Sequence, residues 1–208
     1  MFSGIVDHVG TIVNVTKRTD AMHLRIQSQF DTLKLGDSVS VDGVCLTVTE
    51  INKQIFSCEL SPETLRLCIS HAYQENQAVN LELALRLNEH IGGHLVTGHV
   101  DQMIVVNDIQ PQGEFIEFRF SNISQESQRF LMPKGSVTIN GVSLTVNAVD
   151  QDSFTVMLIP HTLQCTNLSH LKIGQQVNAE WDYMAKLVAR QIGCYLSESE
   201  KEKVYEVI

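Results

Sequence analysis

The chain has 208 residues, of which 43% are hydrophobic, 6% aromatic and 19% charged. This composition is typical of a globular protein of one or two domains that is long enough to bury a core. Fifteen Lys and Arg residues against 24 Asp and Glu residues give a net charge of −9 with histidine neutral. The negative charge argues against a nucleic-acid backbone or an anionic membrane surface as a partner.

The sequence has few features that indicate export, membrane insertion or disulfide formation. The chain has no apolar run of about 18 residues that would span a bilayer, and residues 1–6 lack the features of a signal peptide. The five cysteines form no C-x-x-C pair, which argues against a disulfide framework and a structural zinc site. We therefore expect a cytoplasmic protein with reduced thiols.

The first elements in chain order are short β-strands. Alternating or β-branched apolar residues at 12–15, 39–41, 46–49 and 55–60 are typical of strands, with turn sequences between them. Many closely spaced strands favour a small closed antiparallel barrel. Further along, the prolines in residues 61–64 and 159–162 predict two short helices with Thr64 and Thr162 near the cap.

The second half of the chain repeats the first. Residues 38–82 align with 136–180 at a shift of 98 without a gap, with 16 identities in 45 positions. A weaker match joins residues 3–7 to 97–101. Each copy therefore spans roughly 90 residues, which is enough for a core of its own and too long for a solenoid repeat. We expect a duplicated domain with its boundary near residues 86–94.

The C-terminal segment predicts a helix. Met184, Val188, Ile192 and Tyr195 recur at three- and four-residue intervals, which is typical of an amphipathic helix of about three turns. The apolar stripe must be covered by the chain's own domains or by the same helix of another chain. We expect the second arrangement and therefore a homo-oligomer.

Positions at which the two copies differ are candidates for chemistry, since shared positions serve shape or binding in both. The aligned pairs are Cys45 and Ser143, His99 and Ile5, and Glu63 and His161. Cys45 follows a tight turn, and Ser38 and Thr47 share its strand face, so that thiol and hydroxyl groups are presented to one concavity. The alternative for Cys45 is a buried structural cysteine. The polar residue at the aligned position favours a functional role.

His99 is the candidate acid or base, because an imidazole titrates near neutral pH. The alternative is a structural histidine. His90, His94 and His99 have spacings that superficially suggest a metal site. The intervening Gly92-Gly93 interrupts the helix that would align the first two, and no recognised zinc pattern is complete. No metal site is therefore expected.

Five motifs in this order resemble those of the alpha-type riboflavin synthases, a family with a duplicated lumazine-binding domain. They are Met1-Phe2-x-Gly4-Ile5-Val6, Gly43-x-Cys45-Leu46-Thr47-Val48, Ile91-Gly92-Gly93-His94-Leu95-Val96-Thr97-Gly98-His99-Val100-Asp101, Asn140-Gly141-x-Ser143-Leu144-Thr145-Val146, and the doubled Pro-x-Thr-Leu. The resemblance implies an all-β fold of two tandem, similar, antiparallel six-stranded Greek-key-like barrels at 1–90 and 91–183. A C-terminal α-helix at 184–205, through which three chains associate, would follow them.

The resemblance also implies a transferase activity with a small-molecule substrate. One 6,7-dimethyl-8-ribityllumazine donates a four-carbon unit to a second, giving riboflavin and 5-amino-6-ribitylaminouracil. The family needs no metal or organic cofactor. Its site lies between the N-terminal barrel of one chain and the C-terminal barrel of its neighbour.

Site residues follow from the matching positions. In the N-terminal half-site they are Gly4, Ile5, Val6, Ser38, Cys45, Leu46, Thr47, Glu59, Leu60, Ser61, Pro62, Glu63 and Thr64. In the C-terminal half-site they are Gly98, His99, Val100, Lys134, Ser143, Leu144, Thr145, Met157, Leu158, Ile159, Pro160, His161 and Thr162. Asp182 matches a family carboxylate before the helix. His99 would assist removal of a proton from the C7 methyl group, and Cys45 and Ser38 would stabilise or add to the second lumazine.

Two alternatives belong to other classes. The first is a non-catalytic lumazine or flavin carrier, against which the presence of Cys45 and His99 argues. The second is a purely structural duplicated barrel, which would not explain polar residues at matched positions of the two copies.

Overall fold

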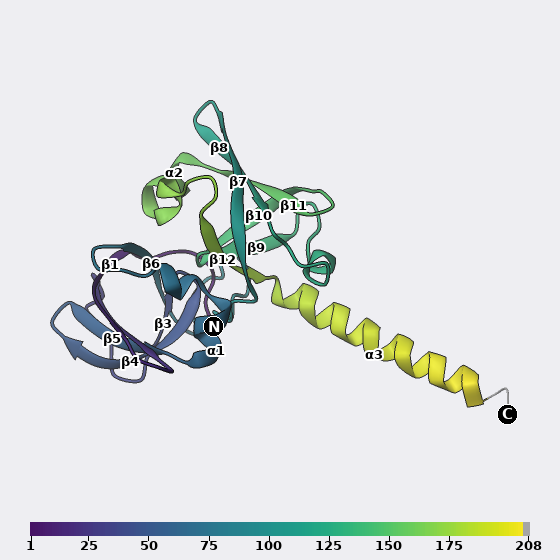
Figure 1. The fold of residues 1–208 in the computed structure, drawn as a ribbon, viewed down its shortest axis with the longest axis horizontal. Helices are drawn as coiled ribbons and strands as arrows, with labels where there is room; N and C mark the ends of the chain where they lie inside the picture. Colours follow the sequence, from purple (N-terminus) through teal and green to yellow (C-terminus); the bar gives the residue numbers. More distant parts are fainter. Residues whose placement is uncertain (206–208) are drawn as a thin grey trace.

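The computed structural model describes residues 1–205, with side chains up to residue 195. Two closed barrels of six antiparallel strands follow one another along the chain, and a long helix leaves the second barrel (Figure 1). The expected all-β fold of two six-stranded barrels and a C-terminal helix is therefore confirmed. In both barrels some neighbouring strands are not consecutive in the sequence, as in a Greek key.

The first barrel closes in the order β1-β2-β5-β4-β3-β6. Its strands are β1 (His8–Lys17), β2 (Met22–Gln27), β3 (Ser38–Val41), β4 (Val44–Asn52), β5 (Ile55–Leu60) and β6 (Ala78–Leu83). Between β5 and β6 lie a short helix, α1 (Pro62–Leu67), and a 3-10 turn, η1 (Ile69–Ala72).

The second barrel has the same cyclic order, β7-β8-β11-β10-β9-β12. Its strands are β7 (Gln102–Gln112), β8 (Phe115–Ser121), β9 (Ser136–Ile139), β10 (Val142–Val149), β11 (Ser153–Leu158) and β12 (Gln176–Trp181). The helical segments are η2 (Ser127–Phe130), α2 (Pro160–Cys165) and η3 (Asn167–His170). Both short helices predicted from the prolines are present.

Alternation along β4 decides what faces the barrel interior. Val44, Leu46 and Val48 are buried in the first core, whereas Cys45 is half-buried and Thr47 is exposed. Strand β10 repeats this pattern in the second barrel. Because successive side chains of a strand point to opposite faces, Cys45 and its counterpart lie on the outer surfaces of the barrels.

The segment that precedes each barrel packs against the other barrel. Val6 contacts the core of the second barrel, and Val100 is part of the core of the first. An isolated antiparallel bridge joins Phe2 to Val96 where the two segments pass each other. We call residues 2–6 and 96–100 the crossing segments, because each precedes one barrel and also contacts the other.

The two barrels contact each other at a pair of turns related by the duplication. Gly43 and Gly141 have φ of +82° and +80°, and a Cβ on Gly43 would lie 2.7 Å from the Gly141 backbone nitrogen. The left-handed conformation favours glycine, and the close approach leaves no room for a side chain. Glycine is therefore required here for two separate reasons.

Substitution of Gly43 tests this contact. Gly43→Ala is expected to lower the free energy of unfolding by the strain of the left-handed conformation, about 1 kcal/mol, and by about 1–3 kcal/mol more from overpacking. Gly36 has φ of +86° with nothing within 4 Å of its would-be Cβ, so Gly36→Ala carries the backbone strain alone. Urea denaturation of both variants measures the difference, and equal midpoints would contradict a packing role for Gly43.

Buried amides and one carboxylate surround the paired turns. The side-chain amide of Asn80 donates to the Asn140 carbonyl at 2.8 Å, and that of Asn178 donates to the Asp42 carbonyl at 2.8 Å. Asp42 Oδ1 accepts from the Asn80 backbone and from Asn167, each at 2.8 Å, while Asp42 Oδ2 is buried without a partner. Burial raises the pKa of Asp42 to about 7.

The raised pKa of Asp42 predicts a pH-dependent stability. The folded chain holds a proton that the unfolded chain releases, so stability falls as the pH rises from about 4 to about 7, by up to about 1.4 kcal/mol per pH unit. Asp42→Asn, the residue that the second copy carries at Asn140, is expected to flatten this slope. Urea midpoints between pH 5 and pH 8 provide the measurement, with exposed Asp152→Asn as the control. An unchanged slope in Asp42→Asn would refute the assignment.

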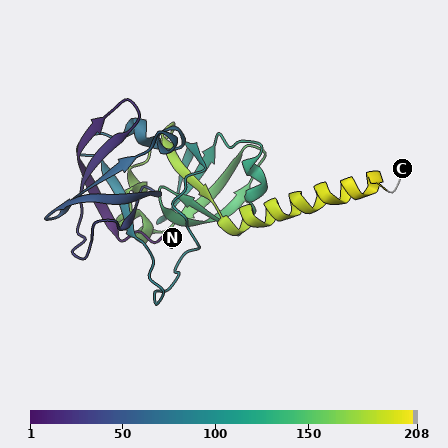
Figure 2. The ribbon, with the colours of Figure 1, turned by 90° about the horizontal axis from the view of Figure 1, so that it is seen from below.

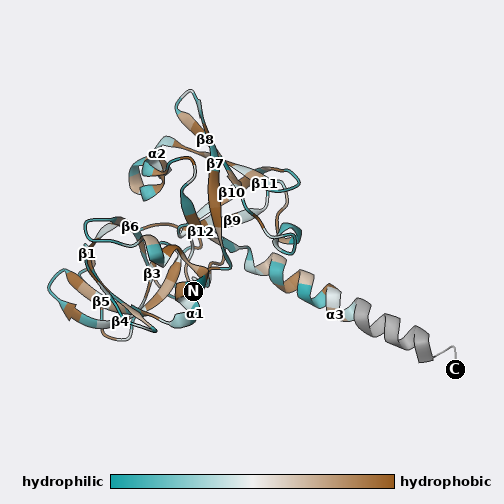
Figure 3. Cartoon of the chain, viewed as in Figure 1, coloured by the Kyte–Doolittle hydropathy of each residue, from teal (hydrophilic) through white to brown (hydrophobic). Residues whose placement is uncertain are grey.

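Helix α3 (Tyr183–Tyr205) projects away from both barrels (Figures 1 and 2). It continues beyond the three amphipathic turns and covers the range expected from the resemblance, 184–205. Up to residue 195, its exposed apolar side chains are Tyr183, Met184, Leu187, Val188, Ile192 and Tyr195. Brown segments of the ribbon in Figure 3 mark hydrophobic residues in this part of the helix. The Lys186 ammonium group contacts Asp101 Oδ2 at 2.8 Å and fixes the start of the helix on the second barrel. Among the described residues, none of the helices combines the length and apolar character needed to cross a membrane.

Candidate functional site

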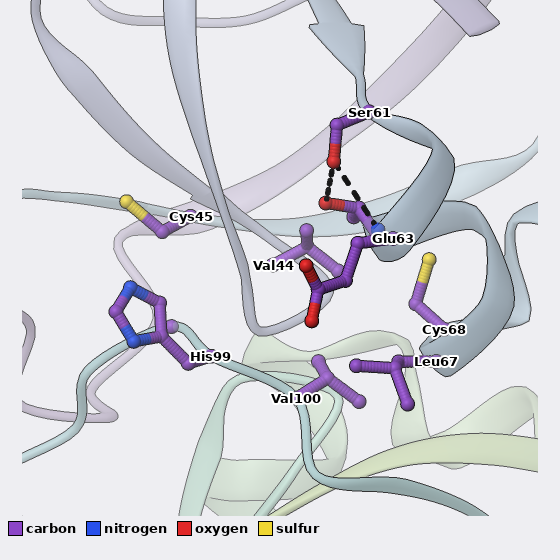
Figure 4. Close-up of a pocket in the computed structure, with 10 residues that line it drawn as sticks. Val44, Cys45, Ser61, Glu63, Leu67, Cys68, His99 and Val100 are labelled. Atoms are coloured by element: carbon purple, nitrogen blue, oxygen red, sulfur yellow. Dashed lines mark hydrogen bonds between the residues drawn. The ribbon is translucent and has the colours of Figure 1, made fainter. Parts of the chain in front are cut away.

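A cavity of about 390 Å³ lies on the outer side of the first barrel, beside the start of β4 (Figure 4). This volume falls within the range of small-molecule sites. The residues that line the cavity are Val44, Cys45, Ser61, Glu63, Thr64, Leu67, Cys68, Gly98, His99 and Val100. Strand β4, helix α1 and the crossing segment of the second copy therefore build it together.

Backbone contact between Cys45 and Gly98 brings the thiol and the imidazole into one cavity. The Cys45 backbone nitrogen donates to the Gly98 carbonyl at 2.8 Å. Gly98 has φ of +78°, and a Cβ there would lie 2.6 Å from the Cys45 Cβ. Only glycine permits this approach, which places His99, the next residue, beside Cys45 (Figure 4).

Helix α1 supplies the hydroxyl and carboxylate groups of the cavity. Ser61 is its N-cap, and the Ser61 Oγ accepts from the Thr64 backbone nitrogen at 3.3 Å (Figure 4). The two side-chain oxygens of Ser61 and Thr64 lie 3.0 Å apart. The N-cap is therefore Ser61, and Thr64 is the third residue of the helix, near the cap as predicted. Glu63 is exposed and carries its carboxylate into the cavity.

Three lining residues were absent from the expected set: Val44, Leu67 and Cys68. Val44 belongs to the core, so the alternation of inward and outward side chains along β4 does not predict it at a site on the outer surface. Leu67 and Cys68 line the cavity because α1 ends there. Burial raises the pKa of Cys68, and it raises that of Cys58 to about 12, so both thiols stay protonated and are poor nucleophiles.

Nine of the residues expected in the N-terminal half-site do not line this cavity: Gly4, Ile5, Val6, Ser38, Leu46, Thr47, Glu59, Leu60 and Pro62. Leu46 and Leu60 are buried in the barrel core. Glu59 is paired with Arg18 at 3.4 Å on the surface. Thr47 is exposed on the outer face of β4, and Ser38 lines a separate hollow.

Ser38 nevertheless shares a sheet face with Cys45. In the β3–β4 pair, Ser38 is opposite Thr47 and Ser40 is opposite Cys45. Ser38 is therefore one register step from Cys45 along the sheet, and its hollow is lined by Lys34, Asp37 and other residues outside the first cavity. Pro62 occupies the first position of α1 behind Ser61.

The structure groups the expected residues differently from the two expected half-sites. Gly98, His99 and Val100, expected in the C-terminal half-site, line the cavity of the first barrel. Conversely, the Gly4 carbonyl accepts from the Ser143 backbone nitrogen at 2.7 Å, and Val6 packs against the second core. The reason is that each crossing segment also contacts the other barrel. The order of residues along the sequence cannot reveal this contact.

Two buried glutamates, Glu82 of β6 and Glu180 of β12, hold each crossing segment to its own barrel. Glu82 accepts from the Ser3 backbone and hydroxyl, each at 2.7 Å, and from the Gly4 backbone at 3.1 Å. Glu180 accepts from the Thr97 backbone at 2.6 Å and hydroxyl at 2.7 Å, and from the Gly98 backbone at 2.9 Å. Burial raises the pKa of Glu82 to about 6 and shifts that of Glu180 in the same direction. The hydrogen bonds oppose the shift in both cases, because they stabilise the ionised form.

Around Ser143 the second copy differs from the first. Ser143 Oγ lies 2.7 Å from Nδ1 of His94, a residue of the linker between the barrels. Ile5, at the position that aligns with His99, is exposed. The second copy thus also combines a polar side chain, Ser143 on β10, with an imidazole. This imidazole, of His94, comes from the linker.

The other expected residues of the second copy divide between surface and core. Leu144 and Leu158 are buried in the core, whereas Lys134, Thr145, Ile159 and His161 are exposed and Met157, Pro160 and Thr162 are half-buried. Asp182 Oδ1 accepts from the Met184 backbone at 2.8 Å at the start of α3. No cluster of three or more His, Cys, Asp or Glu side chains suited to a metal ion occurs within the described part of the chain.

Comparison with known proteins gives a consistent picture. The family model described as "Lumazine binding domain" matches residues 3–84 and again residues 97–182. Riboflavin synthase of Photobacterium phosphoreum is 35% identical over 98% of this chain and 94% of its own length. The enzyme of Bacillus subtilis is 35% identical over 100% and 95%, and that of Chlamydia pneumoniae is 38% identical over 97% and 100%.

Solved structures match the fold. Crystal structures of LumP complexed with riboflavin and with 6,7-dimethyl-8-(1'-D-ribityl)lumazine superpose with TM-scores of 0.80 and 0.78. Both are 23% identical to this chain. The match to the riboflavin complex covers 87% of this chain and 99% of the LumP chain, and the match to the lumazine complex covers 86% and 98%. With two matches to the family model across nearly its whole length and full-length relatives above 30% identity, the chain belongs to the lumazine-binding-domain family that includes these riboflavin synthases.

Proposed function

We propose that this protein is a riboflavin synthase, a transferase that moves a four-carbon unit between two molecules of 6,7-dimethyl-8-ribityllumazine. The products are riboflavin and 5-amino-6-ribitylaminouracil. The observation that carries the proposal is the meeting of Cys45 and His99 in one cavity, across the Cys45–Gly98 backbone contact. Full-length similarity to riboflavin synthases supports it.

The groups present suit this chemistry. The reaction needs a proton removed from the C7 methyl group of one lumazine and stabilisation of the second, and a positioned imidazole and thiol can serve both needs. His99 is the base in this scheme, and Cys45 adds to or stabilises the acceptor. The Thr64 hydroxyl and the Glu63 carboxylate can bind hydroxyl groups of the ribityl chain, while Val44, Leu67 and Val100 supply apolar walls.

Two heterocycles must also be held against each other. Orientation of two reactants can supply a large part of a rate enhancement, and a duplicated fold offers a site for each. Cys45 and Ser143 lie on outer barrel surfaces, so a site on one barrel is open to a partner molecule. The proposal places the reaction between the N-terminal barrel of one chain and the C-terminal barrel of a neighbour, in a trimer held together by α3.

The exposed apolar stripe of α3 is the basis for the trimer. Ile192 is 54% exposed and Tyr195 is 72% exposed on a helix that leaves the barrels. Burial of these side chains against copies of themselves would release apolar surface from water. The domain limits that accompany the proposal are 1–90, 91–183 and 184–205.

One competing function has an observation in its favour. LumP, which resembles this chain in fold, is crystallised in complex with lumazine, riboflavin and flavin mononucleotide. A carrier would bind the ligand without converting it. The thiol and the imidazole in one cavity favour the enzyme, because binding alone requires neither.

Incubation of the pure protein with dimethylribityllumazine alone distinguishes the two functions. The enzyme is expected to form riboflavin at half the molar amount of lumazine consumed, because each turnover uses two molecules and returns one riboflavin. Absorbance of riboflavin and chromatography of the uracil product measure the ratio. Unchanged, bound, fluorescent lumazine would identify a carrier instead.

Variants of the cavity test the assigned roles. His99→Ala and Cys45→Ala are each expected to lower kcat by roughly 100-fold or more, the usual scale for loss of an acid or base, with a much smaller change in lumazine affinity. Cys58→Ala removes a thiol that is buried in the barrel core and should leave kcat nearly unchanged. Steady-state kinetics and fluorescence titration provide the two numbers, and equal losses in rate and affinity would remove these assignments.

A further inference from the structure

His94 is a half-buried titratable residue that the proposed reaction does not yet use. It belongs to the linker before the second barrel. Its Nδ1 lies 2.7 Å from Ser143 Oγ, and its Nε2 lies 3.1 Å from Thr138 Oγ1. Both ring nitrogens are therefore engaged by hydroxyl groups of the second barrel.

The linker is shaped to deliver this imidazole. A Cβ on Gly93 would lie 2.3 Å from the Ser3 carbonyl oxygen and 2.6 Å from the Ser143 Cβ, so only glycine allows the chain to pass. The His94 backbone nitrogen donates to the same Ser3 carbonyl at 3.1 Å. The backbone and the ring of His94 are thus fixed at the same time, against the crossing segment and against β9 and β10.

The protonation state of His94 determines what Ser143 can offer a ligand. Burial lowers the pKa of His94, and the opposing charge of Asp182 has a smaller effect; its other neighbours, Thr138 and Ser143, carry no charge. A neutral imidazole has one donor and one acceptor nitrogen. If Nδ1 accepts, the Ser143 hydroxyl donates its proton to His94 and keeps its oxygen lone pairs for a ligand.

We propose that His94 is a positioning residue of the second half-site, which orients the Ser143 hydroxyl toward bound lumazine as a hydrogen-bond acceptor. This inference rests on the proposed function. Ser143 is the aligned counterpart of Cys45 on the outer face of its barrel, so it occupies the place where the second ligand would bind. The two half-sites then differ in kind: the first presents a thiol beside His99, and the second presents a hydroxyl whose proton is held by His94.

Protonation of His94 would reverse the arrangement. Both ring nitrogens of an imidazolium donate, so Ser143 would accept from Nδ1 and turn its own proton toward the ligand. The second half-site would then present a donor where it had presented an acceptor. Turnover is therefore expected to fall on the acid side as His94 takes up a proton.

Three variants of the full chain test the role. His94→Ala is expected to lower kcat at least 10-fold. His94→Gln keeps a neutral donor and acceptor that cannot titrate, so it should recover part of kcat and lose the acid limb of the kcat profile that belongs to His94. His90→Gln, in an exposed part of the same linker, should match the wild type in both. Wild-type kcat and an unchanged pH profile in both His94 variants would overturn the proposal.

A readout without turnover separates this inference from the proposed function. In ¹⁵N NMR of the histidine side chains at pH 7.5, His94 is expected to be neutral with Nε2 protonated, and Ser143→Ala should convert it to a mixture of tautomers. Titration with riboflavin as the probe should show weaker binding at one of two sites in His94→Ala and unchanged binding at the other. A wild type that makes no riboflavin but shows these two signatures would sink the enzyme and keep the role of His94. A tautomer unaffected by Ser143→Ala, or equal binding at both sites, would overturn that role even in an active enzyme.

Discussion

The site depends on the contact that each crossing segment makes with the other barrel. Glu82 and Glu180 each gather two backbone N–H groups and one hydroxyl of a crossing segment. A buried carboxylate is stable only with such partners, so the segment and the glutamate require each other. Glu180 holds residues 97 and 98 to the second barrel, and the Gly98 carbonyl accepts from the Cys45 backbone nitrogen of the first barrel, so His99 lies beside Cys45. Without this contact between the barrels, the Cys45 thiol and the His99 imidazole would lie apart on different barrels.

Duplication explains why the two barrels can have related sites with different chemistry. Glycine carbonyls contact the aligned backbone nitrogens of Cys45 and Ser143 at 2.8 Å and 2.7 Å, so the frame is the same in both copies. The side chains on the frame differ, and so does the route by which an imidazole arrives. In the proposed reaction two identical substrates must play different roles, and a shared frame with unequal side chains answers this need.

Much of the architecture could be predicted from the sequence. Alternation along residues 46–49 predicted a strand after the turn, with Cys45 and Thr47 on one face, and the ungapped repeat predicted two similar barrels. The partners of each barrel could not be predicted, because the crossing segments are adjacent in sequence to one barrel and packed on the other. His94 was missed for the same reason: its contact with Ser143 spans 49 positions, and no periodicity signals it. Leu46 and Leu60 were expected at the site because they are within the motifs, yet their side chains point into the core.

The interface between the barrels keeps these contacts in register. Asn80 and Asn178 donate across it to the turns at Asn140 and Asp42, next to the point where Gly43 meets Gly141. A rotation of one barrel against the other would break buried hydrogen bonds, each worth about 1 kcal/mol net and more if a group is left unsatisfied. The crossing segments span the same interface, so such a rotation would also displace Gly98 from Cys45 and Gly4 from Ser143. The polar interface therefore keeps both half-sites in place, and they hold their geometry without a bound ligand.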